Sequence, residues 1–279
     1  MTVRDEFKPV IIKVGGALLD DAEASARIWA AIAAATRPII LVHGGGSATD
    51  RLLARLGHTT ARHAGLRVTP DDQIDDVTAS LAGTVNAHIT AHLVRAGARA
   101  IGTTIAAAGI TTCQQHPDTA LARVGIVTNT DSAPLHALLA AGFVPVLSTI
   151  GRDANAQPLN VNADDAAAAI ARAAHAAQLL LLTDVPGVLD ADGNAIPHLD
   201  EPTIESLITA GTITGGMIPK VRAALHTATT AACPVSIAPW RDPTALAAEL
   251  STNPTPTGPD NTHFGTTITA PAQTKQHAP

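Results

Sequence analysis

The sequence predicts an α/β fold: a three-layer αβα sandwich with a mainly parallel central sheet. Strand-like and helix-like segments alternate along the chain, as in a sheet covered by helices on both faces. The segment at residues 179–183 begins with four leucines, as expected of a strand buried on both sides. Two glycine clusters each follow an apolar run and precede a helical stretch. This order places backbone N–H groups at the carboxyl edge of the sheet.

The expected strands are short runs rich in Val, Ile, Leu or Thr, bounded by Gly, Pro or polar residues. They are residues 10–14, 38–43, 100–104, 144–149, 179–183, 235–238 and 264–269. The last alternates Thr and Ile, which suits an edge strand. Residues 105–130 are rich in Thr and Ala with scattered Gly, and predict weak strands or a hairpin.

The expected helices have apolar residues at helical spacing or a high alanine content. They are residues 22–36, 47–56, 71–95, 132–141, 164–177, 201–210 and 218–232. Asp20 and Asp21 open the first of them. Pro70 lies beside the start of the longest one, Gly97 follows its end, and Gly142 ends the fourth.

Composition narrows the class of protein. At 279 residues, the chain can form one large or two medium domains. A formal charge of −6 leaves no broad basic surface, which argues against nucleic acid as a partner. The first ten residues lack a signal-peptide core, and no run reaches membrane-spanning length. Cys113 and Cys233 are far apart, as expected of buried thiols in the reducing cytoplasm.

The glycine clusters are the strongest indication of chemistry. The first is Lys13-Val14-Gly15-Gly16, which taken alone is also compatible with a strand-helix turn and a solvated lysine. The second, Gly44-Gly45-Gly46 after His43, has more glycines than a turn requires, so it favours close approach of an anion to main-chain N–H groups. His43 itself is expected to bond to a backbone group nearby. Neither cluster has Walker or dinucleotide-fingerprint spacing.

Polar residues further along the chain have two interpretations each. Arg67 suits a clamp on a carboxylate, but a lone arginine in such a loop is more often a solvated surface residue. The stretch Asn160-Val161-Asn162-Ala163-Asp164 offers amides to a ligand, and it also predicts a helix cap with Asp164 as the capping residue. The twelve histidines are scattered and predict structural or surface roles, so no protein ligand to a metal is expected.

Taken together, these motifs resemble the amino acid kinase family, whose fold is carbamate kinase-like. The resemblance covers residues 8 to about 268 and is carried by Lys13-Val14-Gly15-Gly16, His43-Gly44-Gly45-Gly46, Gly65-Leu66-Arg67-Val68-Thr69-Pro70, Asn160-Val161-Asn162-Ala163-Asp164, Thr183-Asp184-Val185-Pro186-Gly187 and Gly216-Met217-Ile218-Pro219-Lys220. It implies in-line transfer of the γ-phosphoryl group of ATP to a carboxylate, without a covalent enzyme intermediate.

The resemblance also implies roles at the phosphoryl group. Lys13 and Lys220 would flank the migrating group, with Asp164 between their ammonium groups. The N–H groups of Gly16, Gly44 and Gly45 would bind the phosphoryl oxygens and the attacking carboxylate.

At the two ends of the site, the resemblance implies one set of residues for the acid and another for the nucleotide. Arg67 would clamp the substrate α-carboxylate, and Asn160 and Asn162 would orient its acylated amino group. The nucleotide set is Gly15, Gly16, Thr183, Asp184, Gly187 and Gly216. Mg²⁺ would enter as the ATP complex, through phosphate oxygens and water.

The substrate that the resemblance implies is N-acetyl-L-glutamate, an intermediate of arginine biosynthesis. Residues 102–113 depart from the family pattern, because alanines replace an acidic residue near the expected acid pocket. Two alternatives therefore stay open: a kinase of a related acid, such as an aminoadipate derivative or a phosphonate antibiotic, and a non-catalytic amino-acid-binding regulator.

The resemblance finally implies how the chain is organised. Residues 1–178 would form an amino-terminal lobe for acid binding and dimerisation, residues 179–269 an ATP-binding lobe, and residues 270–279 a disordered tail. Few residues precede the first strand, so the expectation is a homodimer without feedback inhibition by arginine.

Overall fold

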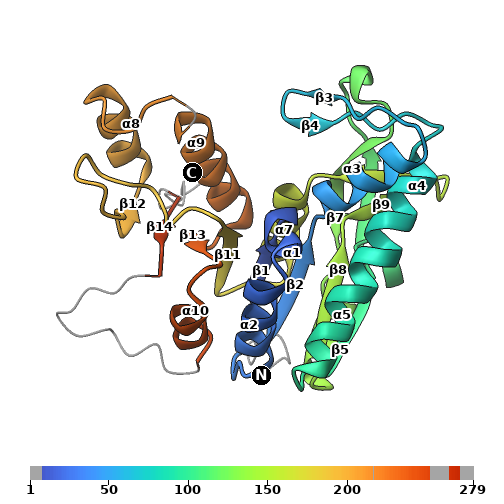
Figure 1. Cartoon of the computed structure of the whole chain (residues 1–279), viewed down its shortest axis with the longest axis horizontal. Coiled ribbons are helices and arrows are strands. Elements are labelled where there is room, and N and C mark those ends of the chain that lie inside the picture. Colours follow the sequence, from blue (N-terminus) through green and yellow to red (C-terminus); the bar gives the residue numbers. More distant parts are fainter. Residues whose placement is uncertain (1–7, 216, 252–263, 271–279) are drawn as a thin grey trace, which may run out of the picture.

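The computed structural model describes residues 8–215, 217–251 and 264–270, and places one eight-stranded sheet between layers of helices (Figure 1). In spatial order the strands are β12 (His198–Leu199), β14 (Thr266–Ile268), β13 (Val235–Pro239), β11 (Gln178–Thr183), β1 (Val10–Val14), β2 (Ile39–His43), β8 (Val144–Ser148) and β5 (Ala100–Thr104). Neighbouring strands are parallel except β13 and β14, which are antiparallel. The expected α/β class is confirmed.

The helices also follow the sequence pattern closely. They are α1 (Gly16–Asp20), α2 (Ala22–Ala33), α3 (Gly46–Arg55), α4 (Ile74–Thr78), the π-helical segment η2 (Ala79–Val85), α5 (Asn86–Arg95), α6 (Ala133–Ala140), α7 (Ala163–Ala173), α8 (Glu201–Thr209), α9 (Met217–Ala231) and α10 (Pro243–Glu249), with 3-10 turns η3 (Ala107–Gly109) and η4 (Thr119–Leu121). Each expected helix is confirmed. The longest is interrupted by η2, and α1 and α10 were not predicted.

Two smaller sheets lie beside the main one. The first has the order β6 (Thr111–Gln115), β7 (Val124–Thr130), β10 (Pro158–Val161) and β9 (Ile150–Arg152), and the second joins β3 (Arg62–His63) to β4 (Leu66–Arg67). The antiparallel pair β6–β7 confirms the expected hairpin. The strand expected at residues 264–269 is confirmed as β14, but its expected position at the edge of the sheet is wrong, because β12 pairs with the outer side of β14.

Alternation along β1 decides where its lysine lies. Val10, Ile12 and Val14 pack into the core that also contains residues of α2, α5 and α10. Ile11 packs into the opposite core, with residues of α7 and α9. Because successive side chains of a strand point to opposite faces, Lys13 lies on the face of Ile11, toward α7.

Two further features bear on sequence expectations. Within the described ranges, no helix is both long and apolar enough to cross a bilayer. Cys113 is buried and Cys233 half-buried, and neither forms a disulfide. Burial raises the pKa of Cys113, and it raises that of Cys233 to about 11, so both remain protonated thiols at neutral pH.

Gly102 in β5 tests how tightly the sheet packs against α5. A Cβ atom at this position would collide with the side chains of Asn86 and Thr90. We therefore expect Gly102→Ala to lower the free energy of unfolding by roughly 2–3 kcal/mol, measured by urea denaturation. Gly83→Ala is the control, since its Cβ would meet nothing within 4 Å. Equal stability of the two variants would contradict this packing.

Candidate functional site

Two adjoining cavities lie where the strands of the main sheet end. The larger has a volume of about 550 Å³ and the smaller about 180 Å³. Leu66 and Asn162 line both of them, so the two cavities meet. This arrangement gives one site two compartments of different size.

The structure brings the expected site residues together around these cavities. The smaller cavity is lined by Gly44, Gly45, Arg67, Asn160 and Asn162. The larger cavity is lined by Lys13, Gly15, Gly16, Asn162, Asp164, Thr183, Asp184, Gly187 and Lys220. Gly216, the remaining expected residue, lies outside the described residues, as does the tail from residue 271 onward.

Lys13 and Asp164 form an ion pair in the larger cavity. The Lys13 Nζ atom lies 2.9 Å from Asp164 Oδ1, and the two side chains are 19% and 45% exposed. β1 supplies the lysine and the first turn of α7 supplies the aspartate. Because the aspartate is nearly half exposed to solvent, the pair adds little stability, and its main effect is to fix where the ammonium group lies.

The start of α7 corrects one expectation. Asn162, not Asp164, is the capping residue: its Oδ1 atom accepts hydrogen bonds from the backbone N–H groups of Asp164 at 2.8 Å and Asp165 at 3.1 Å. Asp164 instead lies in the first turn, where the helix dipole favours a negative charge. The Asn162 amide N–H groups remain available to a ligand.

Lys220 reaches the larger cavity from α9. Its side chain is exposed, and among the described residues it forms no ion pair. In the same part of the chain, Asp164 is paired with Lys13 alone. The cavity therefore holds one oriented ammonium group and one that is free to approach an anion.

The glycine loop after β2 corrects a second expectation. The N–H group of Gly44 donates to the carbonyl oxygen of Val14 at 3.1 Å, which extends the β1–β2 ladder and leaves no free donor. Gly45 and Gly46 follow it, and Gly46 is the first residue of α3, where N–H groups lack helical partners. The free N–H donors of this loop are therefore those of Gly45 and Gly46, and not those of Gly44 and Gly45 as expected.

The same loop requires glycine for steric reasons. A Cβ atom on Gly45 would lie 2.9 Å from Leu81 Cδ2 and within 3.3 Å of both Val85 methyl carbons. A Cβ atom on Gly16, the first residue of α1, would lie 2.7 Å from Ser47 Oγ. Close packing against neighbouring helices thus excludes side chains at both positions and leaves the main chain facing the cavities.

His43 holds this loop from behind. Its Nε2 atom accepts from the Asn86 amide at 2.9 Å, so its Nδ1–H donates to the carbonyl oxygen of Gly44 at 2.7 Å. Burial, opposed by the bond to Gly44, lowers the pKa of His43 to about 4. His43 is therefore neutral at physiological pH. The expected bond to a nearby backbone group is confirmed.

Two arginines supply positive charge to the smaller cavity. Arg67, only 8% exposed, forms an ion pair with Asp50 and donates to the carbonyl oxygen of Gly46 at 2.9 Å. Arg62 lies 3.5 Å from the same carboxylate. Two guanidinium groups and one carboxylate leave a net charge of +1, and no acidic residue lines this cavity within the described ranges. The compartment is suited to a carboxylate.

Asp50 is held ionised by this cluster. Burial acts to raise the pKa of Asp50, but hydrogen bonds and charge from Arg67, with help from Thr60 and Arg62, outweigh burial and lower it. Neither Arg62 nor Asp50 was predicted from the sequence. Only their positions in the sequence could have indicated them. Arg62 precedes Arg67 by five residues, in the strand that pairs with that of Arg67, and Asp50 lies in the helix after the glycine loop.

Asn160 is tied to the arginine through one hydroxyl. Its amide donates to Thr69 Oγ1 at 3.0 Å, and Thr69 Oγ1 donates to the carbonyl oxygen of Arg67 at 3.3 Å. This chain links β10 to the segment after β4. It fixes the amide orientation, so that the Asn160 Oδ1 atom is the group left for a ligand.

Carboxylates in the larger cavity bear on metal binding. Among the described residues, no group of three or more His, Cys, Asp or Glu residues could hold a metal ion. Asp164, Asp165 and Asp184 nevertheless line this cavity. Desolvation by the surrounding protein, and to a lesser extent the negative charge of Asp164, raise the pKa of Asp165. This concentration of negative charge is suited to a hydrated cation that arrives with its own ligands.

The segment that departs from the family pattern lies away from the site. Residues 102–113 span the end of β5, η3 and the start of β6. Within the part of the chain that the structure describes, none of these residues lines either cavity. Their alanines therefore do not change the walls of the smaller cavity, where the acid is expected to bind, contrary to the expectation from sequence.

Comparisons with known proteins agree with this geometry. The family model of the amino acid kinase family matches residues 8–239. An acetylglutamate kinase of Vibrio cholerae serotype O1 is 43% identical over 246 residues, which cover 87% of this chain and 93% of the relative.

Solved structures show the same fold. The protein smu.665 from Streptococcus mutans UA159 has a TM-score of 0.69 at 26% identity, covering 94% of this chain and 98% of its own. A carbamate kinase from Giardia lamblia bound to AMP-PNP has a TM-score of 0.65 at 15% identity, covering 95% and 99%. At that identity, the second comparison supports the fold alone.

The neutral, buried His43 predicts a pH dependence of stability. Its pKa is about 4 in the folded protein and 6.5 when exposed, so the unfolded chain takes up a proton first as the pH falls. Stability should therefore drop between pH 6.5 and pH 4, by up to about 3 kcal/mol from this residue. Urea denaturation of wild type and His43→Gln at each pH isolates the effect. Parallel curves for the two proteins would contradict it.

Proposed function

The chain belongs to the amino acid kinase family, and from this membership we infer that it transfers the γ-phosphoryl group of ATP to the side-chain carboxylate of N-acetyl-L-glutamate. The product is the acyl phosphate N-acetyl-L-glutamyl 5-phosphate, an intermediate of arginine biosynthesis. The enzyme is a phosphotransferase with a carboxyl group as acceptor. Its relative of 43% identity, which aligns with 87% of the chain, is an acetylglutamate kinase.

The observation that carries this proposal is the pairing of the two cavities. The smaller is lined by Arg62 and Arg67, whose charges Asp50 offsets only in part, and it opens beside Asn162 onto the cavity with the lysines. An acid bound by its α-carboxylate at Arg67 would direct its side-chain carboxylate toward the larger cavity. There, the nucleotide would present its terminal phosphate.

The phosphoryl end works by position and charge. In a loose transition state, negative charge lies on the transferred group and on the attacking and leaving oxygens. Lys13, oriented by Asp164, would neutralise this charge from β1, and Lys220 would do so from α9. N–H groups of Gly16, Gly45 and Gly46 would bind the oxygens without reorganising during the reaction. No enzyme nucleophile is required.

The walls of the larger cavity fit ATP. Apolar side chains of Leu181, Val185, Met217 and Ile237 offer a surface for the base, while Gly15 and Gly16 line the phosphate end. The adjacent carboxylates of Asp164 and Asp165 fit Mg²⁺, through water, as part of the nucleotide complex. When bound, the ion would offset phosphate charge and orient the phosphate chain.

The open alternatives carry less support. A non-catalytic regulator has no need of the Lys13–Asp164 ion pair and of Lys220 in one cavity. A kinase of a related acid would need a changed acid compartment. No described residue of that compartment supports such a change, because residues 102–113 lie outside its lining.

The proposal extends to assembly and lobes. The β1–β11 junction would separate an acid-binding lobe, residues 1–178, from an ATP-binding lobe, residues 179–269. β5 pairs only with β8 in the described sheet, and exposed Val94 and Ile101 lie on α5 and β5. This edge supports a homodimer. The proposed location of the enzyme is the cytoplasm.

The reaction can be tested by trapping its product. Purified protein with Mg²⁺, ATP and N-acetyl-L-glutamate should yield a hydroxamate when hydroxylamine is present, because acyl phosphates react with it. A signal with a related acid and none with N-acetyl-L-glutamate would overturn the proposed substrate, and no signal with any acid would overturn the reaction itself.

Lys220→Met should lower kcat by on the order of 10²- to 10³-fold with little change in either KM, because the lysine acts mainly in the transition state. Arg222→Met is the matched control on α9. Arg222 pairs with Glu205 at 3.0 Å, outside the cavities, and its loss should leave kcat close to wild type. Equal kcat values for the two variants would exclude the role of Lys220.

Arg67→Lys should act on the other end of the site. It keeps the charge but loses the bidentate fork, so KM for N-acetyl-L-glutamate should rise roughly tenfold or more, while KM for ATP stays unchanged. Arg27→Lys, on the exposed face of α2, serves as the control. A rise in KM for ATP instead would contradict the proposal, because it would show that Arg67 binds the nucleotide and not the acid.

A further inference from the structure

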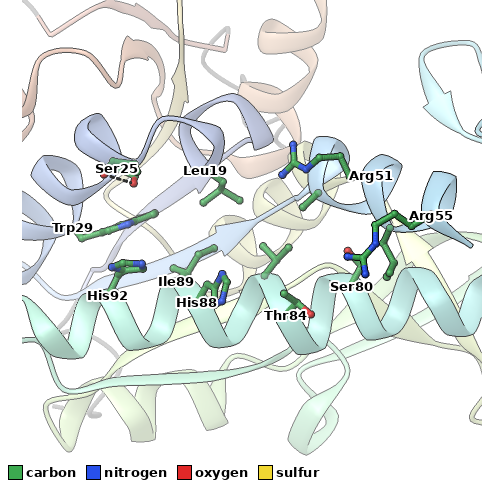
Figure 2. Close-up of a pocket in the computed structure, with 14 residues that line it drawn as sticks. Leu19, Ser25, Trp29, Arg51, Arg55, Ser80, Thr84, His88, Ile89 and His92 are labelled. Carbon is green, nitrogen blue, oxygen red and sulfur yellow. Dashed lines mark hydrogen bonds between the residues drawn. The ribbon is translucent and has the colours of Figure 1, made fainter.

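A third cavity lies behind the site, between α2, α3 and the long helix formed by η2 and α5. Its volume is about 430 Å³, within the range of small-molecule sites. Figure 2 shows Trp29 and His92 at one end of it, and Arg51 and Arg55 at the other. It shares no lining residue with the two cavities of the site.

The floor of this cavity is apolar and rigid. Trp29 is 2% exposed, Ile89 1% and Val85 4%, and all three belong to the core beneath the sheet. Leu19 and Leu52 extend the apolar lining. A ligand with a ring or a short alkyl chain would find a preformed surface here.

The rim of the cavity is basic. Arg51, Arg55, His88 and His92 line it, and no aspartate or glutamate does so among the described residues. Arg51 pairs with Asp20 at 2.8 Å. In the described part of the chain, Arg55, His88 and His92 have neither an ion pair nor a side-chain hydrogen bond. An unpaired guanidinium group and two imidazoles without a partner, above an apolar floor, are complementary to an organic anion.

We propose that this cavity is a binding site for a small organic anion with an apolar body, such as an aromatic or alkyl carboxylate. The body lies against Trp29 and Ile89, and the carboxylate is bound by Arg55 with His88 beside it. Arg51 contributes less, because Asp20 already offsets its charge.

The cavity shares its walls with the acid compartment. α3 carries Arg51 and Leu52 on the new cavity, and Thr49 on the acid compartment. The Thr49 hydroxyl lies 3.0 Å from the Ser80 hydroxyl, which joins α3 to η2. A ligand that changes the distance between α3 and η2 would therefore also change the shape of the acid compartment.

Val85 makes the most direct connection. It lines the new cavity, and its methyl carbons lie 3.2 and 3.3 Å from the position of a Cβ atom on Gly45. It also belongs to a π-helical segment, a local irregularity that is frequent at functional sites. Occupancy of the cavity should alter the affinity for the acid substrate, and by linkage the substrate should alter the affinity for the anion.

Binding can be tested on the full chain by ¹⁵N NMR. The chain has two tryptophans, so two indole N–H signals are expected, assigned with Trp29→Phe. The probe is 4-phenylbutyrate, and 4-phenylbutanol is its uncharged control. The carboxylate should shift the Trp29 signal saturably, and the alcohol should bind about tenfold more weakly. No saturable shift, or equal binding of both probes, would overturn the proposal, including the case in which a second copy of the chain covers the cavity.

Variants separate the site from general charge effects. Arg55→Gln should weaken binding of 4-phenylbutyrate about tenfold, while Arg95→Gln, on α5 but outside the cavity, should not change it. Equal weakening by both variants would contradict the assignment.

A second readout rests on the proposed function. Saturating 4-phenylbutyrate should change KM for N-acetyl-L-glutamate by about twofold or more in wild type and less in Arg55→Gln. Binding at Trp29 with an unchanged KM would overturn the coupling. If the protein showed no kinase activity even without 4-phenylbutyrate, the proposed function would be wrong. The proposed anion site would still be tested by the NMR titration, which does not depend on that activity.

Discussion

The ion pair between Lys13 and Asp164 is the interaction on which the rest of the site depends. It joins the end of β1 to the first turn of α7, and it exists because strand alternation turns Lys13 toward that helix. Asn162 caps α7 and so fixes where the carboxylate lies. A half-exposed pair of this kind contributes little to stability. Its consequence is that one ammonium group is held in place in the larger cavity before any substrate binds.

A second constraint is the packing behind the glycine loop. The loop must expose main-chain N–H groups to an anion, yet it lies directly against η2 and is bonded to a neutral His43. Because Asn86 bonds both to His43 and to the carbonyl oxygens of Thr103 and Val146, the loop is connected to the strands β5 and β8. The proposed anion cavity adjoins this assembly through Val85. Catalytic geometry and the proposed regulation would then use the same helices.

Much of this architecture could be predicted from sequence, because the motifs occur at strand ends and helix starts with strong local signals. Other features depend on contacts between distant segments. The donor at Gly44 is lost to Val14 only because β1 and β2 pair in a particular register. Arg67 is paired with Asp50 on α3, and Asp50 also contacts Arg62 on β3, although no motif connects these residues. β12 has two residues, too few for a periodic pattern. Asn162 and Asp164 are both good caps, and only the backbone geometry distinguishes them.

The most direct test of the central claim is a double-mutant cycle on Lys13 and Asp164, measured as kcat at saturating ATP and N-acetyl-L-glutamate. If Asp164 acts by orienting Lys13, Lys13→Met should lower kcat by on the order of 10²- to 10³-fold, and adding Asp164→Asn should lower it little further. The two effects would then be strongly coupled. Additive losses in the double variant would contradict the account, because the aspartate would then act independently of the lysine it contacts.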